Sequence, residues 1–261
     1  MMKRILTAIA FLLLSAPCKA ALSPKQLSAA TLAPSPGAAL PLDTKFTASD
    51  GRAMSLGEAM NEKPAAMVLV NYTCRFICGT TLAIAAAGLA SSGLEPGKDY
   101  SFIVVGINPK DKPAAAEAMK EAQLAPYPVL RSSAHFLNGD AAAISSVTRA
   151  LNYNPVYDAE RDEYAHPLGA VILTPDGRVS RVISGLDLNA GAFSAALGDA
   201  GQGALSSLVE GIRLLCYGHS PLHGAYNRTA QAALMAGGLI TLAGLAGAAA
   251  FLIRRGGGVQ S

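Results

Sequence analysis

The stretch AAMVLVNYTCRFICGTT, residues 65–81, decides the fold. Its first eight residues, 65–72, form a largely apolar run of strand length, which predicts a strand covered on both faces. Cys74 and Cys78 follow, with three residues between them, and an Ala-rich helical stretch occupies 80–90. Both thiols are therefore expected near the start of a helix, where N–H groups and the helix dipole favour thiolate over thiol.

Outward from this stretch, strands alternate with helices. Expected strands cover 46–48, 100–107, 170–173 and 179–183, and expected helices cover 113–123, a segment around 144–151 and a region from 189. The turn sequence TPDG at 174–177 joins the last two strands into a hairpin. This order predicts an α/β fold with flanking helices, and the hairpin makes its partly parallel sheet mixed.

The composition locates the apolar excess at the two ends of the chain. Hydrophobic residues make up 51% of the 261 residues, charged residues only 15%, and the mean hydropathy is +0.32. These values exclude a disordered or coiled-coil chain. The formal net charge of +3 falls to 0 without Lys3, Arg4 and Lys19. With no basic cluster and no Trp, no nucleic-acid partner is expected.

Both ends have the character of membrane-targeting segments. Residues 1–20 combine Lys3 and Arg4 with an uncharged apolar run at 5–16 and small residues before a cleavage point after Ala20, which is typical of an export signal. Residues 229–253 contain no charge and are long enough to span a bilayer, which predicts a transmembrane helix. The alternative is a buried Ala/Gly-rich helix.

The two motif cysteines leave three chemistries open. A spacing of four residues places their sulfur atoms about one helical turn apart, so both could bind one ion. Cys74 and Cys78 could exchange disulfides, bind a soft metal ion with a third ligand, or form a structural disulfide. The residues alone do not separate these three interpretations.

Four histidines are candidates for the third ligand. His166 lies just before the strand 170–173, in an expected strand-edge loop where functional side chains are common. His135 is expected to pack or to hydrogen-bond locally. His219 and His223 stand near Cys216, close to the expected membrane segment, and these three residues form either a second soft site or an interfacial loop.

Together these segments resemble the SCO (SCO1/SenC) family of copper-binding, thioredoxin-like proteins that help to assemble cytochrome c oxidase. The resemblance covers about 42–226. It rests on VLVNYTCRFIC at 68–78, VVGINP at 104–109, HFLNG at 135–139, and the stretch from Tyr153 through YAH at 164–166 to TPDG at 174–177. The tail LLCY at 214–217, followed by an apolar segment, is similar to a bacterial branch of the family.

The resemblance implies that Cys74, Cys78 and His166 bind one copper ion, as Cu(I) or Cu(II). Two departures from the family pattern concern the surroundings of this site. Gly79 follows the second cysteine where proline is common, and Asp158, Asp162 and Glu163 all compete for the role of the acidic residue before the histidine.

The implied function is that of a copper chaperone tethered to the bacterial inner membrane, with its main domain in the periplasm and its C-terminus in the cytoplasm. Its partners would be the copper-bearing subunit of a respiratory oxidase, other periplasmic copper chaperones or thiol reductants. The alternatives are a thiol–disulfide oxidoreductase acting on oxidase cysteines and a copper- or redox-sensing module. The expected organisation is a signal peptide (1–20), a flexible leader (21–40), a thioredoxin-like domain (41–205), a juxtamembrane helix and loop (206–228), a transmembrane helix (229–253) and a cytoplasmic tail (254–261).

Overall fold

The computed structural model describes residues 22–74, 78–205, 215–216 and 227–256. The chain divides into two compact units, 1–218 and 219–261. The expected signal peptide, the expected juxtamembrane loop except for a few residues, and both His219 and His223 lie outside the described residues.

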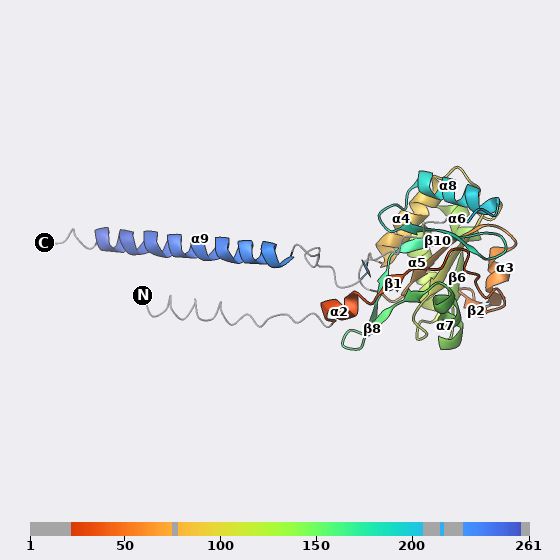
Figure 1. The fold of residues 1–261 in the computed structure, drawn as a ribbon, viewed down its shortest axis with the longest axis horizontal. Helices are drawn as coiled ribbons and strands as arrows, with labels where there is room; N and C mark the ends of the chain where they lie inside the picture. Colours follow the sequence, from red (N-terminus) through yellow and green to blue (C-terminus); the bar gives the residue numbers. More distant parts are fainter. Residues whose placement is uncertain (1–21, 75–77, 206–214, 217–226, 257–261) are drawn as a thin grey trace. The chain divides into compact units, whose positions relative to one another are not determined.

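The first unit is built around a seven-stranded mixed sheet with the order β11-β10-β4-β5-β6-β2-β3 (Figure 1). Its strands are β2 (Lys45–Ala48), β3 (Ala53–Ser55), β4 (Ala65–Val70), β5 (Ser101–Gly106), β6 (His135–Asn138), β10 (Gly169–Leu173) and β11 (Val179–Ser184). β4, β5 and β6 are parallel, whereas β10, β11, β2 and β3 each pair antiparallel with their neighbours. This confirms the mixed sheet with a closing hairpin.

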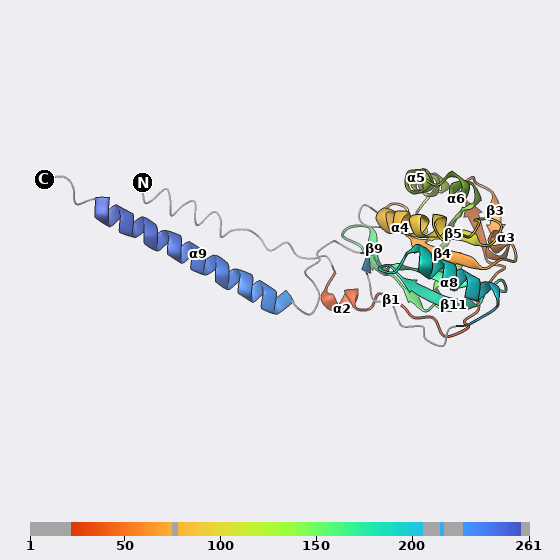
Figure 2. The same cartoon turned by 90° about the horizontal axis from the view of Figure 1, so that it is seen from above.

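Helices cover both faces of this sheet, as the continuous apolar runs of β4 and β5 require. One face packs against α4 (Cys78–Ala90), α5 (Pro113–Leu124) and α8 (Ala190–Gly201). The other packs against α3 (Leu56–Met60) and α7 (Ala141–Ala150). Figure 2 shows α4 with α5 on one side and α8 on the other. Every residue of β4 and β5 is buried, which agrees with the expectation for central parallel strands.

Consecutive residues of β4 show how the two faces are divided. Val68 packs in the cluster beneath α4, and its neighbour Met67 packs in the cluster on the opposite face. Because strand side chains alternate, one apolar run supplies both cores. The α/β architecture, with helices on both faces of a mixed sheet, is thioredoxin-like.

A smaller sheet adjoins this core and has the order β12-β9-β8. It consists of β8 (Val156–Asp158), β9 (Glu163–Pro167) and β12 (Leu215–Cys216). All of its pairs are antiparallel, and in the β12–β9 pair Cys216 lies opposite His166. Neither β8, β9 nor the short helix α6 (Pro128–Ser133) was expected from the sequence, and β6 was missed as well.

The segment expected to be a flexible leader packs on the domain instead. Residues 24–32 form α2 (Pro24–Leu27) and β1 (Thr31–Leu32), and β1 pairs antiparallel with β7 (Tyr153–Asn154). Leu32 is 1% exposed and belongs to the core cluster beneath α7. A few buried aliphatic side chains therefore order a segment whose small and proline residues suggested a linker.

The second unit contains α9 (Asn227–Gly256), a continuous helix of 30 residues. It includes the whole segment expected to span a membrane. Of the helices that the structure describes, none combines the length and apolar character that a membrane span needs.

Candidate functional site

Cys78 is the first residue of α4, directly after the connection from β4. Its side chain is buried in the core cluster on that face of the sheet. The helix therefore begins two residues earlier than expected. The first N–H groups and the dipole of this helix are placed to stabilise negative charge on the sulfur of Cys78 when its proton is lost to a bound metal ion.

His166 lies beside Cys78, although 88 positions separate the two residues in the sequence. Its Nε2 is 3.1 Å from Cys78 Sγ, and its Nδ1 is 3.1 Å from the carbonyl oxygen of Pro167. A carbonyl only accepts, so Nδ1 carries the hydrogen and donates it. In the neutral ring, the lone pair of Nε2 is then directed at the sulfur, an arrangement typical of a metal-ligating or proton-accepting histidine.

The setting of His166 differs from the expectation. The ring lies within strand β9 rather than in a loop, and it is completely buried. Burial lowers the pKa of His166, whereas the hydrogen bond to Pro167 and the negative charge of Cys74 act in the opposite direction. The neutral imidazole, which is the form that binds metal ions, is thus favoured.

Cys74 lies in the connection after β4 and is half-buried. Cys74 packs against the same core cluster as Cys78. Among the side chains that the structure describes, which do not include that of Cys216, no group of three or more His, Cys, Asp or Glu is placed to hold a metal ion. The structure thus brings Cys78 and His166 together, and the three-ligand set stays a prediction.

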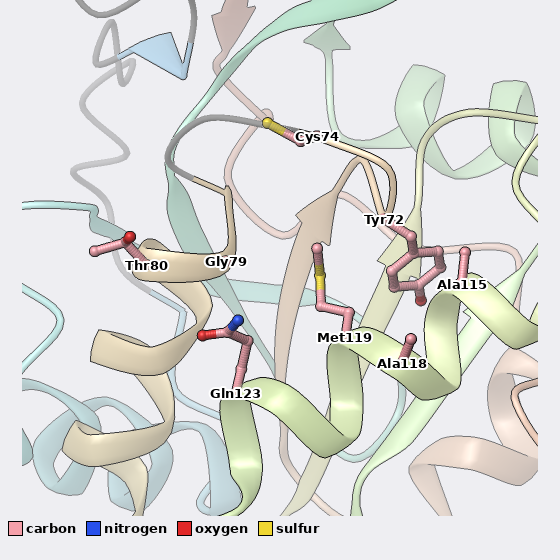
Figure 3. A pocket seen from close by; sticks show the side chains of 8 residues that line it. All are labelled: Tyr72, Cys74, Gly79, Thr80, Ala115, Ala118, Met119 and Gln123. Atoms are coloured by element: carbon pink, nitrogen blue, oxygen red, sulfur yellow. The ribbon is translucent and has the colours of Figure 1, made fainter.

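A pocket of about 470 Å³ opens beside Cys74. Figure 3 shows it between the start of α4 and one face of α5, with the Met119 side chain extending into it from α5. The pocket is lined by Tyr72, Cys74, Gly79, Thr80, Ala115, Ala118, Met119 and Gln123. Cys74 is therefore the motif cysteine that a molecule entering this pocket reaches.

Asp111, which the sequence did not single out, holds the chain that leads into Cys74. Its carboxylate accepts hydrogen bonds from the Tyr72 N–H and the Thr73 hydroxyl, both at 2.9 Å, and from Asn108 Nδ2 at 3.3 Å. The residue is 7% exposed. Burial raises the pKa of Asp111, and the hydrogen bonds from Thr73 and Tyr72 oppose this shift. In the sequence, Asp111 is only the last residue of the turn NPKD at 108–111, a pattern that does not mark its carboxylate as buried.

Tyr72 anchors the same connection from its other side. Its hydroxyl donates toward the carbonyl oxygens of Val104 at 2.9 Å and Leu137 at 3.2 Å, and its ring stacks on Phe136. Burial raises the pKa of Tyr72 well above its ordinary value. At Gly106 an added Cβ would lie only 2.5 Å from the Tyr72 ring, so only glycine fits beneath it.

The three acidic residues that compete for the position before His166 differ in burial. Asp162 is exposed and pairs with Lys110 at 2.6 Å, which lowers the pKa of Asp162. Asp158 and Glu163 are both buried. Lys110 also lies over the ring of Tyr157 on β8. The turn that carries Lys110 and Asp111 therefore contacts both the connection before Cys74 and the hairpin that carries His166.

These features together describe a thioredoxin-like protein with a cysteine pair after its central strand. A buried imidazole lies against the second cysteine of the pair. A copper-bound ScoI from Arabidopsis thaliana is 15% identical, has a TM-score of 0.50, and is covered over 98% of its length by 64% of this chain. A SCO1/SenC family lipoprotein from Bacillus anthracis str. Ames is 18% identical, has a TM-score of 0.50, and is covered over 96% of its length by 64% of this chain. The chain therefore has the fold of the SCO1/SenC proteins.

The same fold occurs in a protein of Aquifex aeolicus VF5 to which electron transfer is provisionally assigned. That protein is 20% identical, has a TM-score of 0.55, and is covered over 94% of its length by 64% of this chain. Comparison of the sequence with family models and with curated proteins finds no match.

Proposed function

We propose that the chain is a member of the SCO1/SenC family and binds one copper ion through Cys74, Cys78 and His166. The contact that carries this proposal is the 3.1 Å approach of His166 Nε2 to Cys78 Sγ, with Nδ1 held by a carbonyl. Thiolate and neutral imidazole are the soft and borderline donors that Cu(I) accepts at low coordination number. The buried pair supplies one donor of each kind.

Copper would leave the site on the side of Cys74. This residue is half-buried and lines a pocket, whereas Cys78 and His166 are buried. An acceptor can bring its own ligand to a copper ion at Cys74 and displace the chain's ligands one at a time. The acceptor that the family resemblance of the sequence implies is the copper-bearing subunit of cytochrome c oxidase.

The test is a Cu(I) competition titration of the reduced full-length chain. His166→Ala should lower the affinity at least about 100-fold, because it removes a ligand from a buried site. His135→Ala is the matched control, since this half-buried ring lies at the start of β6 and should leave the affinity unchanged. Unaltered binding of one equivalent by His166→Ala would refute the copper site.

A thiol–disulfide oxidoreductase is the second candidate, because the two thiols differ in access. The Cys74 thiolate would attack a substrate disulfide, form a mixed disulfide and release one substrate thiolate. Attack of the Cys78 thiolate on the Cys74 sulfur would then release the second thiolate and leave a Cys74–Cys78 disulfide, which an external thiol reductant must reduce. His166→Ala should spare this exchange, so the same variant separates the two functions.

We also propose that α9 anchors the domain to the bacterial inner membrane, with the domain in the periplasm. Support comes from the uncharged segment 229–253, followed by Arg254 and Arg255, and from the exposed apolar side chains of Met235 and Ile240. A reporter active only in the periplasm, fused after Ser261, should be silent. Reporter activity there would reverse the proposed orientation.

A further inference from the structure

Cys216 is the remaining cysteine after the expected export signal, and its place in the fold links it to the candidate site. It stands in the segment LLCYGH, which the site described above does not use. The two residues of β12 pair antiparallel with β9, with Leu215 opposite Pro167 and Cys216 opposite His166. The C-terminal part of the first unit thus returns to the strand that carries the imidazole.

The register has a direct geometric consequence. Residues directly opposite each other in an antiparallel pair share one face of the ladder, with Cβ atoms about 4.5–5.5 Å apart. Cys216 therefore occupies the position next to His166 on the same face of β9. His166 in turn approaches Cys78 Sγ at 3.1 Å. The backbone register thus places a third cysteine opposite the residue that carries the imidazole of the site.

We propose that Cys216 is a further copper ligand, which joins Cys78 and His166. This inference rests on the proposed copper function. Cu(I) is bound well by two thiolates and one imidazole. Each thiol that binds loses its proton to solvent as the Cu–S bond forms, with no change in the oxidation state of copper. Cys74 is then the accessible ligand that an acceptor displaces first.

This arrangement makes copper binding depend on the pairing of β12 with β9. The pairing places Cys216, near the end of the first unit, opposite His166 of the thioredoxin-like domain. In this proposal Cys216 belongs to the candidate site, because β12 is a strand of the small sheet that contains β9. A separate soft site of Cys216 with His219 and His223 stays a prediction, since both histidines lie outside the described residues.

The experiment uses the reduced full-length chain in detergent, with Cu(I) titrated against a chromophoric chelator. Cys216→Ser should weaken Cu(I) binding at least about 10-fold and alter the thiolate-to-Cu(II) charge-transfer absorption of the Cu(II)-loaded chain. Cys216→His should restore part of the affinity, since imidazole is also a copper ligand. Leu215→Val, the matched control in the same strand, should bind Cu(I) as the original chain does.

The outcomes separate the two proposals. If Cys78→Ser and His166→Ala lose copper but Cys216→Ser keeps the original affinity and absorption, the copper site stands and the role of Cys216 is refuted. If Cys216→Ser weakens binding but Cys216→His gives no rescue and both lower the melting temperature of the metal-free chain, Cys216 is structural and the inference also fails. If Cys78→Ser and His166→Ala both bind copper normally, the proposed function itself fails.

Discussion

Asp111→Asn tests whether one buried carboxylate holds the chain that leads into Cys74. The carboxylate accepts two hydrogen bonds at 2.9 Å, from the Tyr72 N–H and the Thr73 hydroxyl. An asparagine presents one oxygen and one NH₂ group, so one of these donors loses its acceptor. An unpaired buried donor costs about 1–3 kcal/mol. Because burial raises the pKa of Asp111, loss of its charge recovers part of this cost, and we expect a net destabilisation of about 1–2 kcal/mol.

The assay is thermal unfolding of the reduced, metal-free chain followed by circular dichroism. A loss of about 1–2 kcal/mol corresponds to a fall in melting temperature of roughly 2–8 °C for a domain of this size. Asp162→Asn is the matched control, since its ion pair with Lys110 is exposed and such pairs contribute at most about 1 kcal/mol. The Cu(I) affinity of Asp111→Asn should also fall, whereas that of Asp162→Asn should not. Equal melting temperatures for both variants and the original chain would refute the reasoning.

Three further predictions concern the same region. Gly79→Pro should raise the free energy of unfolding by about 0.4–1 kcal/mol in a thermal unfolding assay, because Gly79 lies in the first turn of α4 and an added Cβ meets only the flexible end of Gln123. A loss of stability would contradict this prediction. Gly106→Ala should destabilise the chain by about 1–3 kcal/mol in the same assay, because its Cβ meets the Tyr72 ring; no change would show that the ring moves freely. Burial lowers the pKa of His166, so below about pH 6.5 the unfolded chain binds a proton that the folded chain does not, and stability falls by up to about 1.4 kcal/mol per pH unit. His166→Gln should remove this contribution. An unchanged slope of melting temperature against pH would refute the prediction.

The central sheet could be predicted from the sequence because burial on both faces leaves a local mark. β4 and β5 are short, nearly continuous apolar runs. β6 has no such mark, since it is four residues long and begins with His135. β9 contains a glutamate and a proline, which are depleted in strands. Its pairing with β8 and β12 overrides these local preferences.

The candidate site could be predicted only in part, because only some of its features leave a local mark in the sequence. The spacing of Cys74 and Cys78 is local, so the sequence displays it. The approach of His166 to Cys78 joins residues 88 positions apart, and only the family resemblance indicated it. Asp111 is an acidic residue in a turn, and nothing in the local pattern distinguishes a carboxylate that binds a neighbouring connection from one that faces water.

The contact between Cys78 and His166 is also the point at which the two candidate functions exclude each other. A copper ion bound there needs the Cys78 sulfur as a thiolate, whereas a Cys74–Cys78 disulfide consumes that thiolate. Reduced chain and bound metal therefore stabilise each other, and at a free copper concentration of 100 times the Kd the folded state gains about 2.7 kcal/mol. Oxidation removes this gain and leaves the neutral, buried imidazole without its thiolate neighbour. Under the proposed function, an external disulfide that oxidises Cys74 and Cys78 would release copper, and the redox state of the two cysteines would set when the metal can be passed on.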